Sequence, residues 1–220
     1  MTIIHGDNQV ASRQFLINLK NQAMLDGLQI VDQPGESLSL ESIVTSTQSQ
    51  SLLGTTNSVF IEGFFSRRPS NAKKAVIDYL CSHPDLDVTF WDHKDVSAAA
   101  KGISISVFKK FDLPKTVWQF LDTLSLPTLR TTLQVTEADQ LLGLLAVRLH
   151  QLIMISDGTN PLGLAAWQIG KLKAQAAKFS TAKLLTMHTE LLTIDYRRKT
   201  SSTASDLASA LEVWLITHVR

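Results

Sequence analysis

Apolar residues in the first 95 positions form two kinds of repeat that follow one another. Short runs with strand-like composition lie at 2–5, 28–31, 59–61 and 87–91. Between them, apolar positions recur at helical spacing over 10–25, 40–47 and 70–81. Strands that alternate with helices predict a parallel sheet with crossover helices. The best-marked helix is 70–81, because Ser70 or Asn71 can cap its first turn and Pro84 follows its end.

The pattern changes after about residue 133, where strand-like runs give way to helical repeats. Four repeats span 136–155, 162–178, 181–196 and 203–219, with short breaks between them. Consecutive amphipathic helices with tight connections are typical of a bundle. The segment 96–130 joins the two parts, and Pro114 can begin a helix there whose apolar face holds Val117, Trp118, Phe120 and Leu121. We expect an α/β domain over 1–95, a helical connector over 96–130 and an all-α domain over 131–220.

Composition favours a globular chain that works away from membranes. The 220 residues are 44% hydrophobic and 19% charged, with a formal net charge of +1. This near-neutral balance gives no general attraction to nucleic acid. The single cysteine, Cys81, cannot form an internal disulfide, and the first residues lack a signal segment. Because the apolar runs are interrupted well short of the roughly 20 residues of a membrane span, we expect a cytoplasmic protein.

The loop after the first expected strand, HGDNQVAS, lies where many α/β proteins hold a phosphate. A phosphate-binding loop needs several glycines, a lysine for the β- and γ-phosphates and a hydroxyl for magnesium. Only Gly6 is present, no lysine follows, and Asp7 would repel a phosphate. We therefore expect no ATP hydrolysis at this loop and no cofactor.

The densest polar cluster is WDHKD, at the end of the strand predicted over 87–91. Asp92, His93 and Asp95 could act as an acid/base set or bind a metal, as in a small phosphotransferase-like enzyme. The alternative is a solvated turn, which we favour because no second group of ligands has a suitable spacing. We assign no catalytic residue and no metal site.

A small group of basic residues lies before and inside the helix at 70–81. Arg67, Arg68, Lys73 and Lys74 could contact phosphates, including those of DNA. The alternative is an ordinary solvated surface, which is common on neutral proteins and which we favour.

Four stretches of the chain together resemble a known family. They are TIIHGDN at the start, SLSLESIVTSTQSQSLLGTTNSVFIEG in the first half, and PLGLAAWQIGKLKAQAAKFSTAKLLTMHTELLTIDYRRKT with ALEVWLITHV near the end. In this order they are similar to the delta subunit of the bacterial DNA polymerase III clamp loader. The resemblance implies an AAA+-like P-loop fold that has lost its ATP site, followed by a collar-like helical domain. Members of the family are usually longer, and 96–130 has room only for a trimmed lid domain.

The resemblance also gives a role to two adjacent leucines in a polar stretch. Members of the family insert a hydrophobic pair from a Ser-Leu-Phe-like motif into a pocket on the sliding clamp, and Ser51, Leu52 and Leu53 match that motif by position, with Leu53 in place of the aromatic residue. Burial of a leucine contributes about 1.5 to 3 kcal/mol. The alternative is that the leucines close this protein's own core beside Val59, although neighbours on a helix point about 100° apart.

The expected function is therefore that of a non-catalytic clamp-loader subunit of the replicative DNA polymerase III holoenzyme. Its expected partners are the sliding clamp, the ATPase-bearing loader subunits and, within that complex, primer-template DNA. Two alternatives stay open: a helical adaptor protein unrelated to replication, and the phosphotransferase-like enzyme at Asp92, His93 and Asp95.

Overall fold

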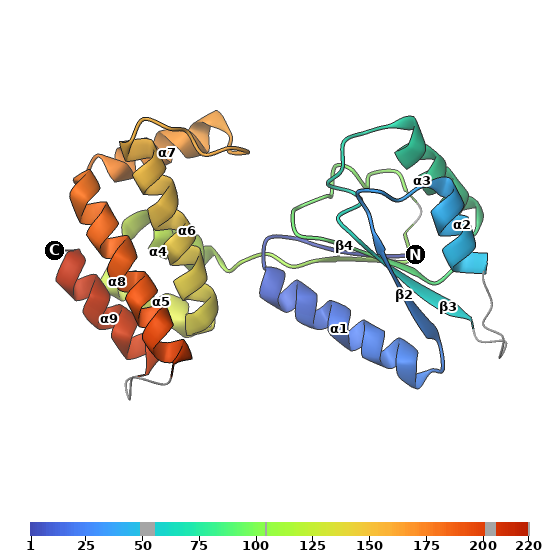
Figure 1. The fold of residues 1–220 in the computed structure, drawn as a ribbon, viewed down its shortest axis with the longest axis horizontal. Coiled ribbons are helices and arrows are strands. Elements are labelled where there is room, and N and C mark those ends of the chain that lie inside the picture. Colours follow the sequence, from blue (N-terminus) through green and yellow to red (C-terminus); the bar gives the residue numbers. More distant parts are fainter. Residues whose placement is uncertain (49–55, 104, 201–205, 220) are drawn as a thin grey trace. The chain divides into compact units, whose positions relative to one another are not determined.

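The computed structural model describes residues 1–48, 56–103, 105–200 and 206–219, which fall into two compact units (Figure 1). The first unit is Met1–Leu113 and the second is Pro114–Arg220. We expected divisions at 95 and 130, with a separate connector between them. The structure instead divides this connector, because its first part completes the sheet and its second part forms helices of the second unit.

The first unit is a parallel sheet with helices in its crossover connections. Its elements, in chain order, are β1 (Thr2–His5), α1 (Gln9–Leu25), β2 (Gln29–Pro34), α2 (Leu40–Gln48), β3 (Asn57–Glu62), α3 (Asn71–Ser82), β4 (Val88–Asp92) and β5 (Val107–Lys110). The five strands lie in the order β2-β3-β4-β1-β5, and every pair of neighbours is parallel. The α/β alternation predicted for this part of the chain is therefore present.

The two faces of the sheet carry separate hydrophobic layers, because successive strand residues point to opposite faces. One layer joins α1 to the sheet and contains Ile4, Leu16, Ala23, Phe60 and Trp91. The other layer lies under α2, α3 and the segment after β4, and its members are Ile3, Leu38, Ile43, Val59, Ile61, Phe64, Phe65, Val76, Leu80, Val88, Phe90, Val96 and Ala100. Figure 1 shows α1 on one side of the sheet and α2 with α3 on the other.

Strand β5 was missing from the expected elements. It is a four-residue edge strand whose neighbour is β1, and all four of its residues are exposed. An exposed strand has no buried apolar run to mark it. The sequence does carry a weaker pattern, because Ile103, Ile105 and Val107 alternate with serines at a period of two.

The described part of the second unit is helical. Its elements are α4 (Lys115–Thr123), α5 (Leu126–Leu133), α6 (Ala138–Ser156), α7 (Ala166–Ala176), α8 (Thr181–Lys199) and α9 (Leu207–His218). Helix α4 begins just after Pro114, and Val117, Phe120 and Leu121 are buried as its pattern predicts. Trp118 does not belong to the buried face, since it is 42% exposed.

Helix α6 corresponds to the helical repeat predicted over 136–155, and it is strongly apolar. It has 19 residues and a mean hydropathy of 1.3, so by length and composition it is the one helix in the described ranges that could cross a membrane. A core helix passes the same test, and α6 packs against α4, α7, α8 and α9. Its Arg148 is buried and lies 3.2 Å from Asp122 Oδ1, which keeps the charge paired inside the unit.

Candidate functional site at the carboxyl edge of the sheet

The connection between β1 and α1 is short and is held by the segment that follows β5. It consists of Gly6, Asp7 and Asn8, and Asn8 caps α1 by accepting from Ala11 N. The Asn8 N–H donates to Phe111 O at 3.0 Å. The Asp7 carboxylate accepts a hydrogen bond from Leu113 N at 2.6 Å. The Asn8 N–H and the Asp7 carboxylate are therefore both engaged within the unit.

Gly6 lets these two segments approach closely. Its φ is +126°, and a Cβ at this position would lie 2.1 Å from Phe111 O. The Gly6 N–H donates to Lys94 O at 3.2 Å, and Phe111 N donates to His5 O at 2.8 Å. The chain itself thus packs against the loop at the place where a phosphate-binding loop would need open backbone N–H groups.

Beside this loop, a charged network surrounds the end of β5. Lys110 Nζ lies 2.9 Å from Asp95 Oδ2 and 3.1 Å from Asp112 Oδ2. Asp95 Oδ1 also accepts from Ser97 N at 2.9 Å. Hydrogen bonds from Ser97 and Lys110 lower the pKa of Asp95 well below its ordinary value, so this carboxylate stays charged and paired.

His5 ends β1 and is fully buried. Its Nδ1 accepts from Val96 N at 3.3 Å, while its Nε2 has no hydrogen-bond partner among the described residues. Burial lowers the pKa of His5, and Asp95, whose Oδ1 is 3.6 Å from Nδ1, offsets part of that effect. The imidazole is therefore held in its neutral form and stabilises the turn after β4.

The three candidate residues of WDHKD have different surroundings. Asp92 is buried and accepts hydrogen bonds from Phe65 N at 3.1 Å and Ser66 N at 2.9 Å, so it holds the loop after β3. His93 is exposed, and Asp95 is engaged with Lys110. Among the described residues, no group of three or more His, Cys, Asp or Glu has a geometry that could hold a metal ion.

Two of the four candidate phosphate contacts stabilise the same loop. Lys73 is 7% exposed, and its Nζ donates to Phe65 O at 2.8 Å and Arg67 O at 3.0 Å. Burial lowers the pKa of Lys73, although the nearby Asp92 raises it in part. Arg67 is half-buried and donates to Leu38 O at 2.9 Å.

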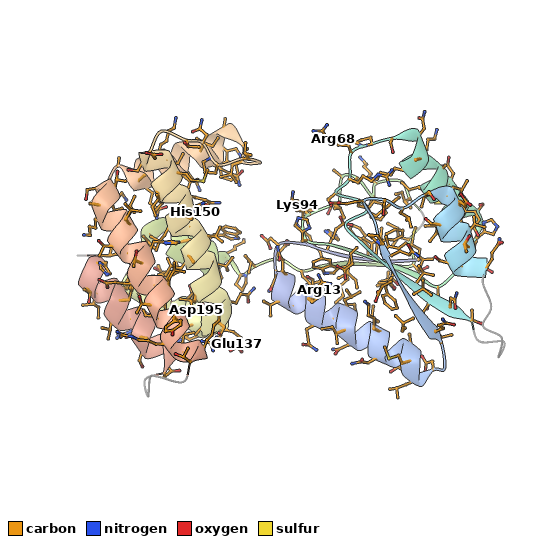
Figure 2. All side chains as sticks on the ribbon, in the orientation of Figure 1. Arg13, Arg68, Lys94, Glu137, His150 and Asp195 are labelled. Atoms are coloured by element: carbon orange, nitrogen blue, oxygen red, sulfur yellow. The ribbon has the colours of Figure 1, made fainter. Side chains whose placement is uncertain are left out.

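The other two basic residues, Arg68 and Lys74, are exposed. Figure 2 shows Arg68 on the loop that leads to α3. The four cations therefore divide into two that bind the protein's own carbonyl groups and two that face solvent. The sequence spacing could not separate these pairs, because it does not report which side of a loop is buried.

A cavity at the carboxyl ends of β2, β3 and β4 was not expected from the sequence. Its volume is about 450 Å³, and it is lined by Asp32, Gln33, Pro34, Glu36, Glu62, Gly63, Ser66, Trp91 and His93. Arg13, shown on α1 in Figure 2, stacks 3.9 Å above the Trp91 ring and lies 2.5 Å from Glu62 Oε1. Open α/β sheets often bind ligands at this edge. None of the described lining residues is Lys or Arg, so the cavity is poorly suited to phosphate.

Ser51, Leu52 and Leu53 lie outside the described residues. They belong to residues 49–55, between the end of α2 at Gln48 and the start of β3 at Asn57. The side-chain amide of Asn57 donates to Ser46 O at 2.7 Å. This bond joins the end of α2 to β3 and fixes the two ends of the intervening segment.

Comparisons with known proteins give a distant likeness among solved structures. No family model matches the chain, and no curated protein matches it. Among solved structures, the DNA clamp loader delta protein of Bacillus subtilis is similar over 98% of this chain and 94% of that chain, with 10% sequence identity and a TM-score of 0.43. A likeness at this level does not decide what the chain does.

Proposed function

We propose that the chain is a non-catalytic clamp-loader subunit. Its α/β unit would bind and open the sliding clamp, and its helical unit would assemble with subunits that carry the ATPase activity. The proposal that this subunit is non-catalytic is supported by the closed connection between β1 and α1. The Gly6 and Asn8 N–H groups donate to Lys94 O and Phe111 O, and Asp7 accepts from Leu113 N, which supports a loop that is used within the unit rather than by a nucleotide phosphate.

The clamp contact is proposed for Ser51, Leu52 and Leu53, on the resemblance of their motif and its position before β3. The bond between Asn57 and Ser46 supports the proposal, because a segment with fixed ends loses less conformational entropy when it binds. Opening of the clamp follows if this subunit binds the open ring more tightly than the closed one. Primer-template DNA is a further proposed partner. We propose that it contacts Arg68 and Lys74, which are both exposed.

The proposal is tested by calorimetric titration of the purified chain into the sliding clamp of the same organism. We expect binding in the micromolar range or tighter, which Leu52→Ala/Leu53→Ala abolishes, because two buried leucines contribute about 3 to 6 kcal/mol together. Leu162→Ala is the matched control, since Leu162 is a 97% exposed leucine of the helical unit. Circular dichroism of each variant reports whether the fold is kept.

Two results would contradict the proposal. If wild type does not bind the clamp, the clamp-loader function is wrong. If the double variant loses its circular dichroism signal together with binding, Leu52 and Leu53 belong to the protein's own core rather than to the contact.

A further inference from the structure

Helices α6 and α8 pack side by side in the helical unit and run in opposite directions (Figure 1). Arg198, near the end of α8, pairs with Asp139 at the start of α6. At the other end, Ser156 Oγ and Thr181 Oγ1 are 2.6 Å apart, which joins the end of α6 to the start of α8. These two contacts fix which turns of the two helices lie opposite each other.

Two histidines face each other where α6 meets α8. At a rise of 1.5 Å per residue, His150 lies about 9 Å before Ser156 along α6, and His188 lies about 10 Å after Thr181 along α8. Both are therefore at the same level, and the centres of their rings are 6.4 Å apart, with an angle of 46° between the ring planes. His150, shown on α6 in Figure 2, is exposed, and His188 is half-buried.

The two imidazoles have no charged partner within the chain. Among the described residues, neither side chain takes part in a hydrogen bond or an ion pair. Burial and the neighbouring His150 lower the pKa of His188, and no carboxylate opposes this shift. His188 is therefore a neutral imidazole at neutral pH, which is the form that binds a metal ion.

The spacing of the rings is close to that of a metal site with two histidines. A Zn–N bond is about 2.0 to 2.1 Å long, which puts the centre of each bound imidazole roughly 3.2 Å from the metal ion. At a tetrahedral angle the two ring centres are then roughly 5.2 Å apart. Because His150 is exposed, a small rotation of its side chain can close the remaining distance of about 1 Å.

The donor atoms select the kind of metal ion. Imidazole nitrogen suits Zn²⁺, Cu²⁺ and Ni²⁺, whereas Mg²⁺ and Ca²⁺ prefer oxygen ligands. The described His, Cys, Asp and Glu residues offer no third ligand here, so the other coordination positions are left to water.

We propose that His150 and His188 bind one divalent transition-metal ion such as Zn²⁺, which links α6 to α8. The proposal goes beyond the clamp-loader function and does not depend on it, because it involves neither the clamp nor residues 51–53.

The test is calorimetric titration of zinc chloride into the full chain, prepared without a histidine tag. Two of the four protein ligands of a structural zinc site supply roughly half of its binding free energy, which corresponds to a dissociation constant of about 1 to about 200 µM. We expect Zn²⁺ to bind in this range. His150→Gln and His188→Gln should each weaken this binding at least about tenfold, since each removes one of the two imidazole ligands.

A double variant in the α/β unit is the control, because Cys81 is exposed and lies near the exposed His83 on the chain. Cys81→Ser/His83→Gln should keep the binding that His150→Gln weakens. Amide signals in nuclear magnetic resonance spectra locate the ion. Zn²⁺ should shift the signals around residues 150 and 188 in wild type and leave them unchanged in His150→Gln, which should keep the wild-type melting temperature because His150 is exposed.

Three results would overturn the proposal. The first is a wild-type chain that does not bind Zn²⁺ with a dissociation constant below about 1 mM. The second is an affinity that His150→Gln leaves unchanged. The third is binding that only Cys81→Ser/His83→Gln removes.

Discussion

Replacing Gly6 with alanine is expected to detach the segment after β5 from the sheet. The added Cβ would lie 2.1 Å from Phe111 O and 2.7 Å from Phe111 C. These are backbone atoms, so no side-chain rotation can relieve the overlap and the segment itself must move. The φ of +126° is a second source of strain for any residue with a Cβ.

The size of the effect follows from the contacts that the movement breaks. Three hydrogen bonds would be lost: Phe111 N to His5 O, Asn8 N to Phe111 O, and Leu113 N to Asp7 Oδ1. At about 1 kcal/mol net for each bond, with about 1 to 3 kcal/mol of backbone strain, the loss is about 4 to 6 kcal/mol. This is a large part of the stability of a domain, which is typically about 5 to 15 kcal/mol.

Hydrogen exchange and denaturation measure this loss directly. We expect the amides of Phe111 and Leu113 to exchange about a thousandfold to ten-thousandfold faster in Gly6→Ala, since each 1.4 kcal/mol is about a factor of ten. Gly27→Ala is the matched control, because Gly27 has a φ of +78° and nothing within 4 Å of its added Cβ. It should show strain of about 1 to 2 kcal/mol without faster exchange at those two amides. Equal losses in the two variants would refute the packing role of Gly6.

Three other variants test the carboxyl edge of the sheet. Asp92→Asn should lower the free energy of unfolding by about 2 to 3 kcal/mol, because it loses a charged acceptor of two backbone N–H groups; an unchanged urea midpoint would argue against this. The pKa of Asp95 is lowered in the folded state, so this carboxylate stabilises the fold above its ordinary pKa of 3.8 and stabilises it less as the pH falls below that value. The melting temperatures of wild type and Asp95→Asn should therefore differ at neutral pH and converge in acid. His5 also has a lowered folded pKa, so protonation favours the unfolded chain and stability should fall as pH decreases below 6.5. His5→Asn should show less of this fall in denaturant titrations at about pH 7 and about pH 5, and an identical pH dependence would contradict the assignment.

Periodicity predicted the main elements because most of them bury one face. Helix α3 shows this well, since Val76 and Leu80 are buried and Ser70 caps the first turn by accepting from Lys73 N. Strands β3 and β4 were also easy to predict. Both are buried on two faces, so each forms a largely apolar run in the sequence. The local sequence is sufficient to predict a helix or strand where its residues are buried in a regular pattern.

The parts that sequence could not predict depend on tertiary contacts. Strand β5 is exposed at the edge of the sheet, so its apolar residues show no clear burial pattern. The role of Lys73 depends on two carbonyl groups that come close only after the loop beyond β3 folds over α3. The sequence shows Gly6 only as a lone glycine. A side chain is excluded at this position by the backbone of Phe111, which is more than a hundred positions away in the sequence.

The proposed binding of a sliding clamp is measured by titrating the wild-type chain into the purified clamp of its own organism. We expect saturable heat of binding in the micromolar range or tighter. A clamp that gives no heat of binding at calorimetric concentrations, with the chain folded by circular dichroism, would contradict it.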